Sequence, residues 1–274
     1  IYRGQADDRW GLVPGICRTG WLNRIVPYLP AHFRALECDD EDVSFDDKAK
    51  IEYGAVLGFI ETADQSGIEL PNYSTALRKK MIMNNTSIND AVFYPGLPNG
   101  WRSGDNYDEL IALTQHYEIP TRFMDWSFSP SVAVYFAAWD ALMKTPDPEP
   151  EEIVVWFFNV GKNSANLDSV DWKLVQVSRQ GNPRLRKQEA VFTTAKTYDG
   201  LRYVRETTGF DYLVSTKMKE TGKSLAENAL GRIRLPFSEA HVLLDAISSS
   251  NVNGQTLYPG YEGVIRFMKE MAMI

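Results

Sequence analysis

The residues best suited to chemistry lie in one stretch, 115–138, which reads QHYEIPTRFMDWSFSPSVAVYFAA. Arg122 and Trp126 stand there among apolar residues. Ser129 is a favoured helix N-cap and Pro130 a favoured first helical residue, so the sequence predicts that a helix begins here. Free backbone N–H groups at the start of a helix can bind an anion. The stretch therefore predicts a binding site at a strand-to-helix junction.

A second candidate is Arg3, near the start of the chain. Residues 1–5 (IYRGQ) predict a short strand that ends in a glycine turn, with the guanidinium of Arg3 at the strand end. The planar fork of an arginine suits a phosphate or a carboxylate. The alternative is a structural arginine paired with Asp7, Asp8 or Asp125.

Glu189 and His116 complete the candidates. Glu189 stands at the opening edge of a predicted strand, 188–194, after a basic approach, 183–187. His116 ends a predicted helix, 106–116, directly before the chemical stretch. A catalytic or ligand-binding role is one interpretation of His116, and a structural histidine at a helix C-terminus is the other.

Composition limits the classes of protein to consider. The 274 residues are 44% apolar, which is enough for a real core, and the net charge of −7 argues against nucleic-acid binding by overall charge. Local basic patches such as 179–187 remain open. Two cysteines without metal-ligand spacing predict a reducing, cytoplasmic location and no metal site. We expect no membrane span, and the opening without Met indicates that residues precede Ile1.

The pattern of elements predicts an α+β fold. Residues 153–160 (IVVWFFNV) are typical of a strand buried on both faces, and helices are predicted at 21–37 and 48–64. We expect one domain, 1–274, with a central mixed or mainly antiparallel sheet. Residues 20–104 are expected to form a mostly helical insertion.

Together, the motifs YRGQ, QHYEIPTRFMDWSFSP, RLRKQEAVF and LYPGYEG resemble the FRG domain family of bacteria and phages. That family is named for its Phe/Tyr-Arg-Gly opening. The resemblance spans Tyr2 to about Phe267, and the central motif is long enough to be specific. It implies a domain family rather than a reaction.

A weaker resemblance concerns chemistry. An arginine at the end of a first strand, a Ser-x-Ser strand entering an apolar helix and a glutamate opening a later strand are similar to the Arg-Ser-Glu pattern of ADP-ribosyltransferases. The resemblance implies that Arg3 holds the phosphates of NAD, that Ser127 and Ser129 support its nicotinamide end, and that Glu189 stabilises the oxocarbenium-like transition state. The sequence departs from many transferases at Lys187, where Glu or Gln is usual two residues before the catalytic glutamate.

The leading hypothesis is an NAD-cleaving enzyme similar to ADP-ribosyltransferases, an effector of bacterial toxin or anti-phage systems. Its substrate would be NAD, with a protein or nucleic acid as the acceptor and no metal. The alternative is a non-catalytic domain that senses a nucleotide or another anion. The residues expected at the site are Glu189 and His116 for catalysis and, for binding, Tyr2, Arg3, Gly4, Arg122, Trp126, Ser127, Ser129 and Gln188.

Overall fold

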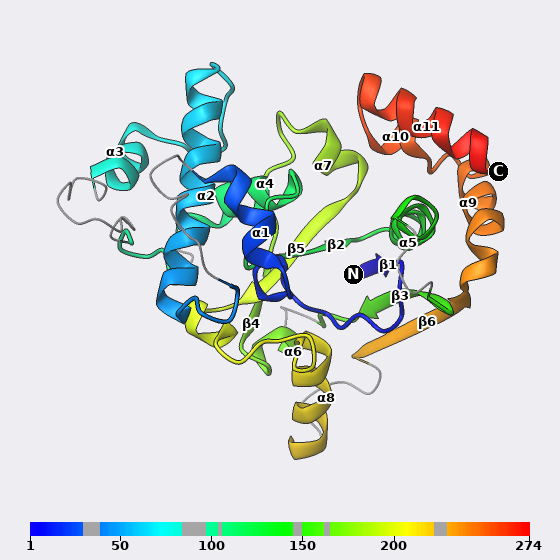
Figure 1. Ribbon diagram of the computed structural model, residues 1–274, viewed down its shortest axis with the longest axis horizontal. Coiled ribbons are helices and arrows are strands. Elements are labelled where there is room, and N and C mark those ends of the chain that lie inside the picture. The colour runs from blue at the N-terminus through cyan, green and yellow to red at the C-terminus, as the bar shows by residue number, and fades with distance from the viewer. Residues whose placement is uncertain (30–38, 84–96, 104–105, 145–149, 162–164, 222–228) are drawn as a thin grey trace.

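A computed structural model describes residues 1–29, 39–83, 97–103, 106–144, 150–161, 165–221 and 229–274 (Figure 1). Within these residues, six strands form one sheet in which every neighbouring pair is antiparallel. The mainly antiparallel α+β architecture expected from the sequence is confirmed. The strands are Tyr2–Gln5 (β1), Met124–Ser127 (β2), Glu152–Phe158 (β3), Trp172–Val175 (β4), Ala190–Ala195 (β5) and Leu230–Pro236 (β6).

The sheet consists of two halves that meet at its centre. The strand order is β4-β5-β2-β1-β3-β6, so β2 and β1 are the central pair. These two strands are in register at a single position, Tyr2 opposite Ser127. By contrast, β2 pairs with β5 at four positions, as β1 does with β3. The halves β4-β5-β2 and β1-β3-β6 are therefore joined by a short ladder.

Helices surround this sheet (Figure 1). Between the N-terminus and β3, the described helices are Trp21–Ile25 (α1), Phe45–Gln65 (α2), Thr75–Met83 (α3), Asp108–His116 (α4) and Pro130–Lys144 (α5). Those that follow are Ala165–Asp168 (α6), Pro183–Lys187 (α7), Phe210–Thr221 (α8), Ala240–Ser249 (α9), Gly254–Leu257 (α10) and Tyr261–Met273 (α11). The described helices within 20–104 are α1, α2 and α3, and α2 contributes to two of the core clusters.

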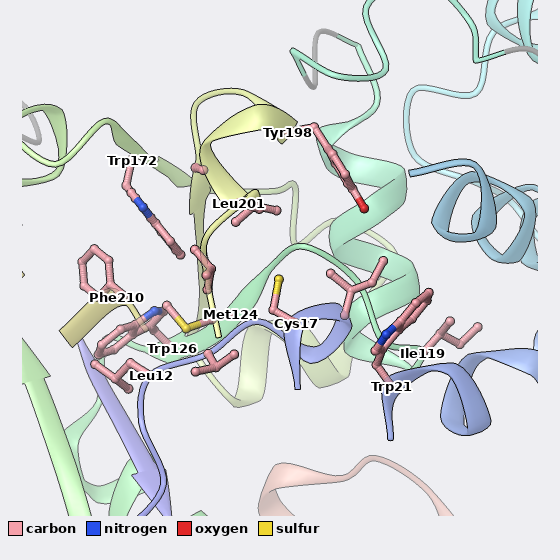
Figure 2. Close-up of a cluster of buried hydrophobic side chains, with 14 of the residues drawn as sticks. Leu12, Cys17, Trp21, Ile119, Met124, Trp126, Trp172, Tyr198, Leu201 and Phe210 are labelled. Carbon is pink, nitrogen blue, oxygen red and sulfur yellow. The ribbon is translucent and has the colours of Figure 1, made fainter. Parts of the chain in front are cut away.

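Alternating side chains divide the core between the two faces of the sheet. One face carries Trp126, Val154 and Val191, which pack against Leu12 and Phe210 in a single large cluster (Figure 2). The opposite face has two clusters. One joins α2 and α4 to β5, and the other joins α5 and α9 to β3. Each half of the sheet thus has its own core on this face.

Several local predictions need correction. The helix predicted at 21–37 is α1 followed by a 3-10 turn, Val26–Tyr28, because Pro27 cannot donate a helical hydrogen bond; residues 30–38 lie outside the described residues. The basic approach, 183–187, is the short helix α7, and the strand predicted at 188–194 is β5, Ala190–Ala195. Asp105, which the sequence predicts as the cap of the helix 106–116, lies outside the described residues.

Candidate functional site

The Arg-Ser-Glu residues lie on three neighbouring strands of the sheet. Ser127, the last residue of β2, is opposite Tyr2 of β1 on one side and Ala190 of β5 on the other. Arg3 follows Tyr2, and Glu189 precedes Ala190. The backbone N–H of Phe128 donates to the carbonyl of Glu189 at 3.1 Å, which extends the ladder by one position. We call this region, where β1, β2 and β5 come together, the strand junction.

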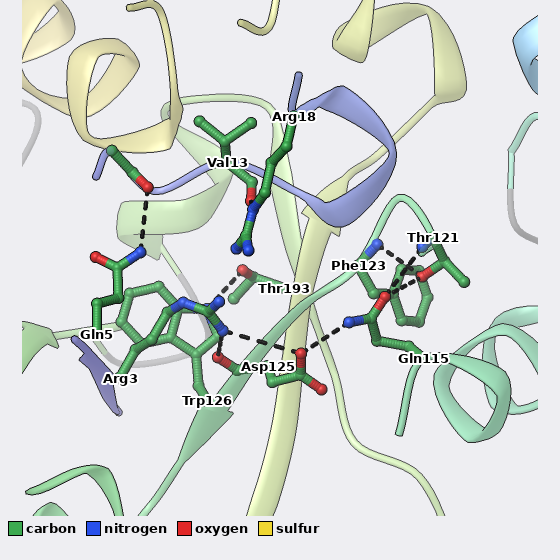
Figure 3. A network of polar contacts seen from close by, with 11 residues as sticks. Arg3, Gln5, Val13, Arg18, Gln115, Thr121, Phe123, Asp125, Trp126 and Thr193 are labelled. Atoms are coloured by element: carbon green, nitrogen blue, oxygen red, sulfur yellow. Dashed lines mark hydrogen bonds and ion pairs between the residues drawn. The ribbon is translucent and has the colours of Figure 1, made fainter. Parts of the chain in front are cut away.

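Arg3 occupies the space where β1 and β2 separate (Figure 3). Its Nη1 donates to the backbone carbonyl of Asp125 at 2.6 Å and lies 3.9 Å from the Asp125 carboxylate. The structural pairing with Asp125 weighed from the sequence is therefore present. Asp7, the other strong candidate, instead pairs with Arg9 at 2.6 Å. Arg3 is nevertheless not saturated, because its buried Nε has no hydrogen-bond partner.

A second arginine, Arg18, lies above Arg3 in Figure 3. Its Nε donates to the carbonyl of Val13 at 2.9 Å, which directs the guanidinium towards the junction. Burial and, to a smaller extent, the positive charge of Arg3 lower the pKa of Arg18 to about 10. Two cations therefore face one carboxylate, Asp125, and an incoming anion would relieve their repulsion. Sequence spacing gave no sign of Arg18, because a loop far from the motif residues places it here.

Gln115 fixes the third side of this network. Its Nε2 donates to the Asp125 carboxylate at 2.8 Å, and its Oε1 accepts from both the backbone N–H and the hydroxyl of Thr121 at 3.1 and 2.8 Å (Figure 3). The Gln and Thr of the QHYEIPTR motif thus hold the chain that enters β2. The motif positions Asp125 beside Arg3.

Ser127 and Ser129 shape the turn into α5 and the approach to Glu189. The Ser127 hydroxyl donates to the carbonyl of Gln188 at 2.8 Å and accepts the N–H of Ser129 at 2.9 Å. Ser129 accepts the N–H of Val132 at 3.5 Å, and α5 begins at Pro130 as predicted. Ser127 is buried, so it acts on the neighbouring backbone. Gln188 is buried as well, and its Nε2 donates to the carbonyl of Leu257 at 3.4 Å.

Glu189 has an unusual backbone conformation. Its φ is 47°, in the left-handed region that non-glycine residues seldom adopt. The side chain is exposed. The N–H of Glu189 donates to the carbonyl of Arg186 at 3.2 Å, and the preceding carbonyl is held by Ser127, so the strain is fixed by hydrogen bonds on both sides. Strained backbone of this kind is common where a side chain must be aimed at a ligand.

His116 lies beneath α7. Its exposed fraction is 6%, and its Nε2 has no hydrogen-bond partner. Burial and, to a smaller extent, the positive charge of Arg184 lower the pKa of His116 to about 3. The imidazole is therefore neutral at pH 7, with a proton on only one ring nitrogen. It is not in the doubly protonated form that acts as a general acid. His116 contacts Tyr117 and is influenced by Arg184, but no contact joins it to Arg3 or Ser127.

Two residues expected at the ligand are buried structural groups. Arg122 is 2% exposed and donates to Glu52 of α2 at 2.6 and 2.9 Å and to the carbonyl of Trp101 at 2.7 Å. Trp126 is 3% exposed and donates from Nε1 to Thr193 at 2.8 Å. Both are corrections, because neither side chain is accessible to a ligand. The partner could have been suspected from the sequence, because Glu52 is a carboxylate among the apolar residues of α2.

Gly4 and Tyr2 also have structural roles, because both take part in the packing of β1. A Cβ at Gly4 would overlap the carbonyl oxygen of Ala133, so glycine is needed there for β1 to lie against α5. This differs from the cofactor contact expected of Gly4. Tyr2 is partly buried against the α5 and α9 cluster. Of the candidate residues, Ser127 is hydrogen-bonded to Ser129 and Gln188, and Glu189 directly follows Gln188, whereas Arg3 is bonded to Asp125.

A large groove is lined in part by Leu185 of α7. Its volume is about 1010 Å³, and its lining includes Phe59, Tyr117, Gln180 and Leu185. No group of three His, Cys, Asp or Glu side chains among the described residues is placed to hold a metal ion. In the same part of the chain, every helix is too short or too polar to cross a membrane.

Comparisons with known proteins give one match. Residues 72–145 match the model of the FRG domain family, a segment that covers α3, α4, β2 and α5 with the complete QHYEIPTRFMDWSFSP motif. No curated protein and no solved structure matches the chain. The segment that carries Gln115, Asp125 and Ser127 of the strand junction is therefore similar to the FRG domain.

Proposed function

We propose that this domain binds NAD at the strand junction and cleaves its nicotinamide–ribose bond, as ADP-ribosyltransferases do. The observation that carries the proposal is the placement of Glu189. Glu189 is an exposed carboxylate on a strained turn. It directly precedes β5, which pairs with β2, the strand that ends at Ser127. Arg3 lies on β1, the neighbour of β2 on its other side.

Arg3 and Arg18 are suited to the phosphates of the dinucleotide. The two guanidiniums lie close enough for the charge of Arg3 to lower the pKa of Arg18, and the Nε of Arg3 is free to donate. A pyrophosphate carries two negative charges and offers several acceptor oxygens, which matches two planar donors. Asp125 keeps Arg3 in place when no anion is bound.

Glu189 would act on the ribose. In the reaction the bond between ribose C1′ and the nicotinamide nitrogen breaks, and its electron pair goes to nicotinamide, which becomes neutral. Positive charge then develops on the ribose, and an adjacent carboxylate stabilises it. A nucleophile of the acceptor donates an electron pair to C1′ and loses a proton. The Ser127 hydroxyl contributes by holding the Gln188 carbonyl and hence the turn that carries Glu189.

The test is nicotinamide release from NAD by the purified protein. Glu189→Gln keeps the size of the side chain and removes its charge, so we expect turnover to fall roughly 100-fold or more while NAD binding measured by calorimetry is retained. Glu220→Gln, another exposed glutamate, is the matched control and should leave turnover unchanged. Absence of both release and NAD binding in the unaltered protein would refute the proposal.

A non-catalytic domain that senses a nucleotide or another anion is the second candidate. It is favoured by Arg3 and Arg18, which form a cationic pair that does not depend on Glu189. Binding of NAD or of a simpler nucleotide, lost in Arg18→Ala and unchanged in Glu189→Gln, without nicotinamide release, would support this function over the enzyme.

A further inference from the structure

The segment that leads into Glu189 is unusual in its charge. Residues 179–187 (RQGNPRLRK) contain four basic residues and no acidic one, in a chain whose net charge is −7. Arg179, Arg186 and Lys187 are exposed. In the part of the chain that the structure describes, Arg186 and Lys187 form no ion pair, whereas cations such as Arg78, Arg102 and Lys196 each have a carboxylate partner. Arg184, by contrast, lies 3.8 Å from Glu118 and 4.0 Å from Glu262. Exposed cations without an internal partner, such as Arg186 and Lys187, are suited to an external polyanion.

Aromatic rings lie directly beneath these arginines. The guanidinium of Arg179 is 6.0 Å from the ring centroid of Phe128, which is 38% exposed. The guanidinium of Arg184 is 5.9 Å from the ring of Tyr117, which is 48% exposed. Cations that follow a backbone together with exposed rings on which bases stack are typical of proteins that bind single-stranded nucleic acid.

The large groove begins at the same place. Tyr117 lines it and stacks on Phe59, with ring centroids 5.9 Å apart and planes 30° apart. The side chains of Gln180 and Asn182 are at its edge on the basic segment. A groove of about 1010 Å³ with rings on its wall accommodates one or two nucleotide bases. Its lining also includes Glu61, Glu69 and Glu109, so the phosphates must stay outside it, on the basic segment.

The basic segment is held rigidly. The Asn182 side chain caps α7 by accepting the N–H of Leu185 at 3.0 Å, and Leu185 is buried. The end of the segment is tied by Ser127 to Gln188 and by Gln188 to Leu257. The cations are therefore presented from a fixed backbone, which lowers the entropic cost of binding.

From these contacts we infer that residues 179–187 and the adjoining groove bind single-stranded nucleic acid, which is the acceptor of ADP-ribose at Glu189. The phosphates lie on Arg179, Arg186 and Lys187, and bases stack on Tyr117 and Phe128. The acceptor role rests on the proposed function, whereas the binding does not. In the transfer, a base nitrogen or a hydroxyl oxygen donates the electron pair that forms the bond to ribose C1′. Nicotinamide leaves with the electron pair of the broken bond, and the acceptor proton passes to solvent.

Fluorescence anisotropy with labelled 12-nucleotide RNA and DNA strands tests the binding. We expect affinity to fall steeply between 50 and 200 mM salt, with a slope that Lys187→Ala reduces by about 0.7. Lys79→Ala, an exposed lysine on α3, is the matched control and should leave affinity and slope unchanged. Tyr117→Leu should weaken binding roughly 5- to 100-fold with the slope unaltered, because it removes stacking and no charge.

Three outcomes would overturn the inference. They are no binding at 50 mM salt, equal loss in Lys187→Ala and Lys79→Ala, and equal affinity for polyglutamate of the same charge. Transfer of label from NAD that is radioactive in its adenylate phosphate tests the acceptor role. Nicotinamide release without labelled nucleic acid would refute that role and leave the proposed function standing. Strand binding without any nicotinamide release would refute the proposed function and leave the binding site standing.

Discussion

Arg3 and Arg122 each stand in a motif that the sequence analysis singled out, but their surroundings give them different roles. Arg122 donates to Glu52 and to a backbone carbonyl, and its guanidinium also faces the rings of Trp101 and Tyr198 at 4.7 and 4.6 Å. Arg3 keeps one donor without a partner and lies beside a second arginine. A free donor, rather than the residue type, makes Arg3 the candidate for binding an anion.

His116 gives a prediction at the residue scale. Because its pKa is lowered to about 3 in the folded chain, from an ordinary value of 6.5, the unfolded chain takes up the proton first as pH falls. The stabilising effect of a neutral His116 is present above pH 6.5 and is lost as pH falls towards 3. When the pH is lowered from 7 to 4.5, the free energy of unfolding of His116→Gln should fall by about 2–3 kcal/mol less than that of the unaltered protein.

Urea denaturation at pH 7.0, 5.5 and 4.5 measures this difference. His241→Gln is the matched control, because His241 is an exposed histidine on α9. Parallel pH profiles for the unaltered protein and His116→Gln would contradict the assignment of a neutral, buried imidazole.

At the scale of elements, β1 is the strand on which the junction depends. It has few residues, pairs with β2 at one position, and lies against α5 through a glycine. The opening Tyr-Arg-Gly motif therefore combines two functions: Arg3 projects into the junction, and Gly4 lets the strand approach α5. The strand and the α5 helix must be correctly packed before Arg3 can reach Asp125.

Gly4→Ala tests this packing. The added methyl group would overlap the Ala133 carbonyl, which belongs to a helix backbone and cannot turn away. We expect a loss of about 3 kcal/mol in the free energy of unfolding, measured by urea denaturation. Gly67→Ala separates overlap from backbone strain, because a methyl group there meets no atom within 4 Å but the φ of 69° is unfavourable for alanine, so a loss of about 1 kcal/mol is expected. A similar small loss in both variants would show that β1 and α5 are less closely packed.

At the scale of the whole molecule, we expect the described helices of the segment 20–104 and the sheet to unfold as one cooperative unit. Glu52 of α2 is fully buried and accepts three hydrogen bonds from Arg122, which directly precedes the chain entering β2. The same α2 helix contributes to the clusters on both faces of the sheet. Loss of this contact should therefore unfold more than the helix.

Glu52→Ala should lower the free energy of unfolding by about 3–5 kcal/mol, because it leaves the charge of Arg122 buried without a partner. Calorimetry should show a single transition at a lower temperature, with Glu69→Ala as the control at an exposed site. Two separate transitions, one for the helical segment, would contradict the single unit.

The sequence by itself determined the local structure around the central motif. The Ser129 cap with Pro130 predicted the start of α5, and the β-branched run predicted β3, because capping and side-chain alternation depend on neighbouring residues. The tertiary structure alone decided that Arg3 keeps a donor without a partner whereas Arg122 is paired with Glu52. It also decided that Ser127 holds the turn that carries Glu189. Glu52 is 70 positions from Arg122, and Ser127 is 61 positions from Gln188. Such pairings depend on how the elements pack, and no local pattern encodes them.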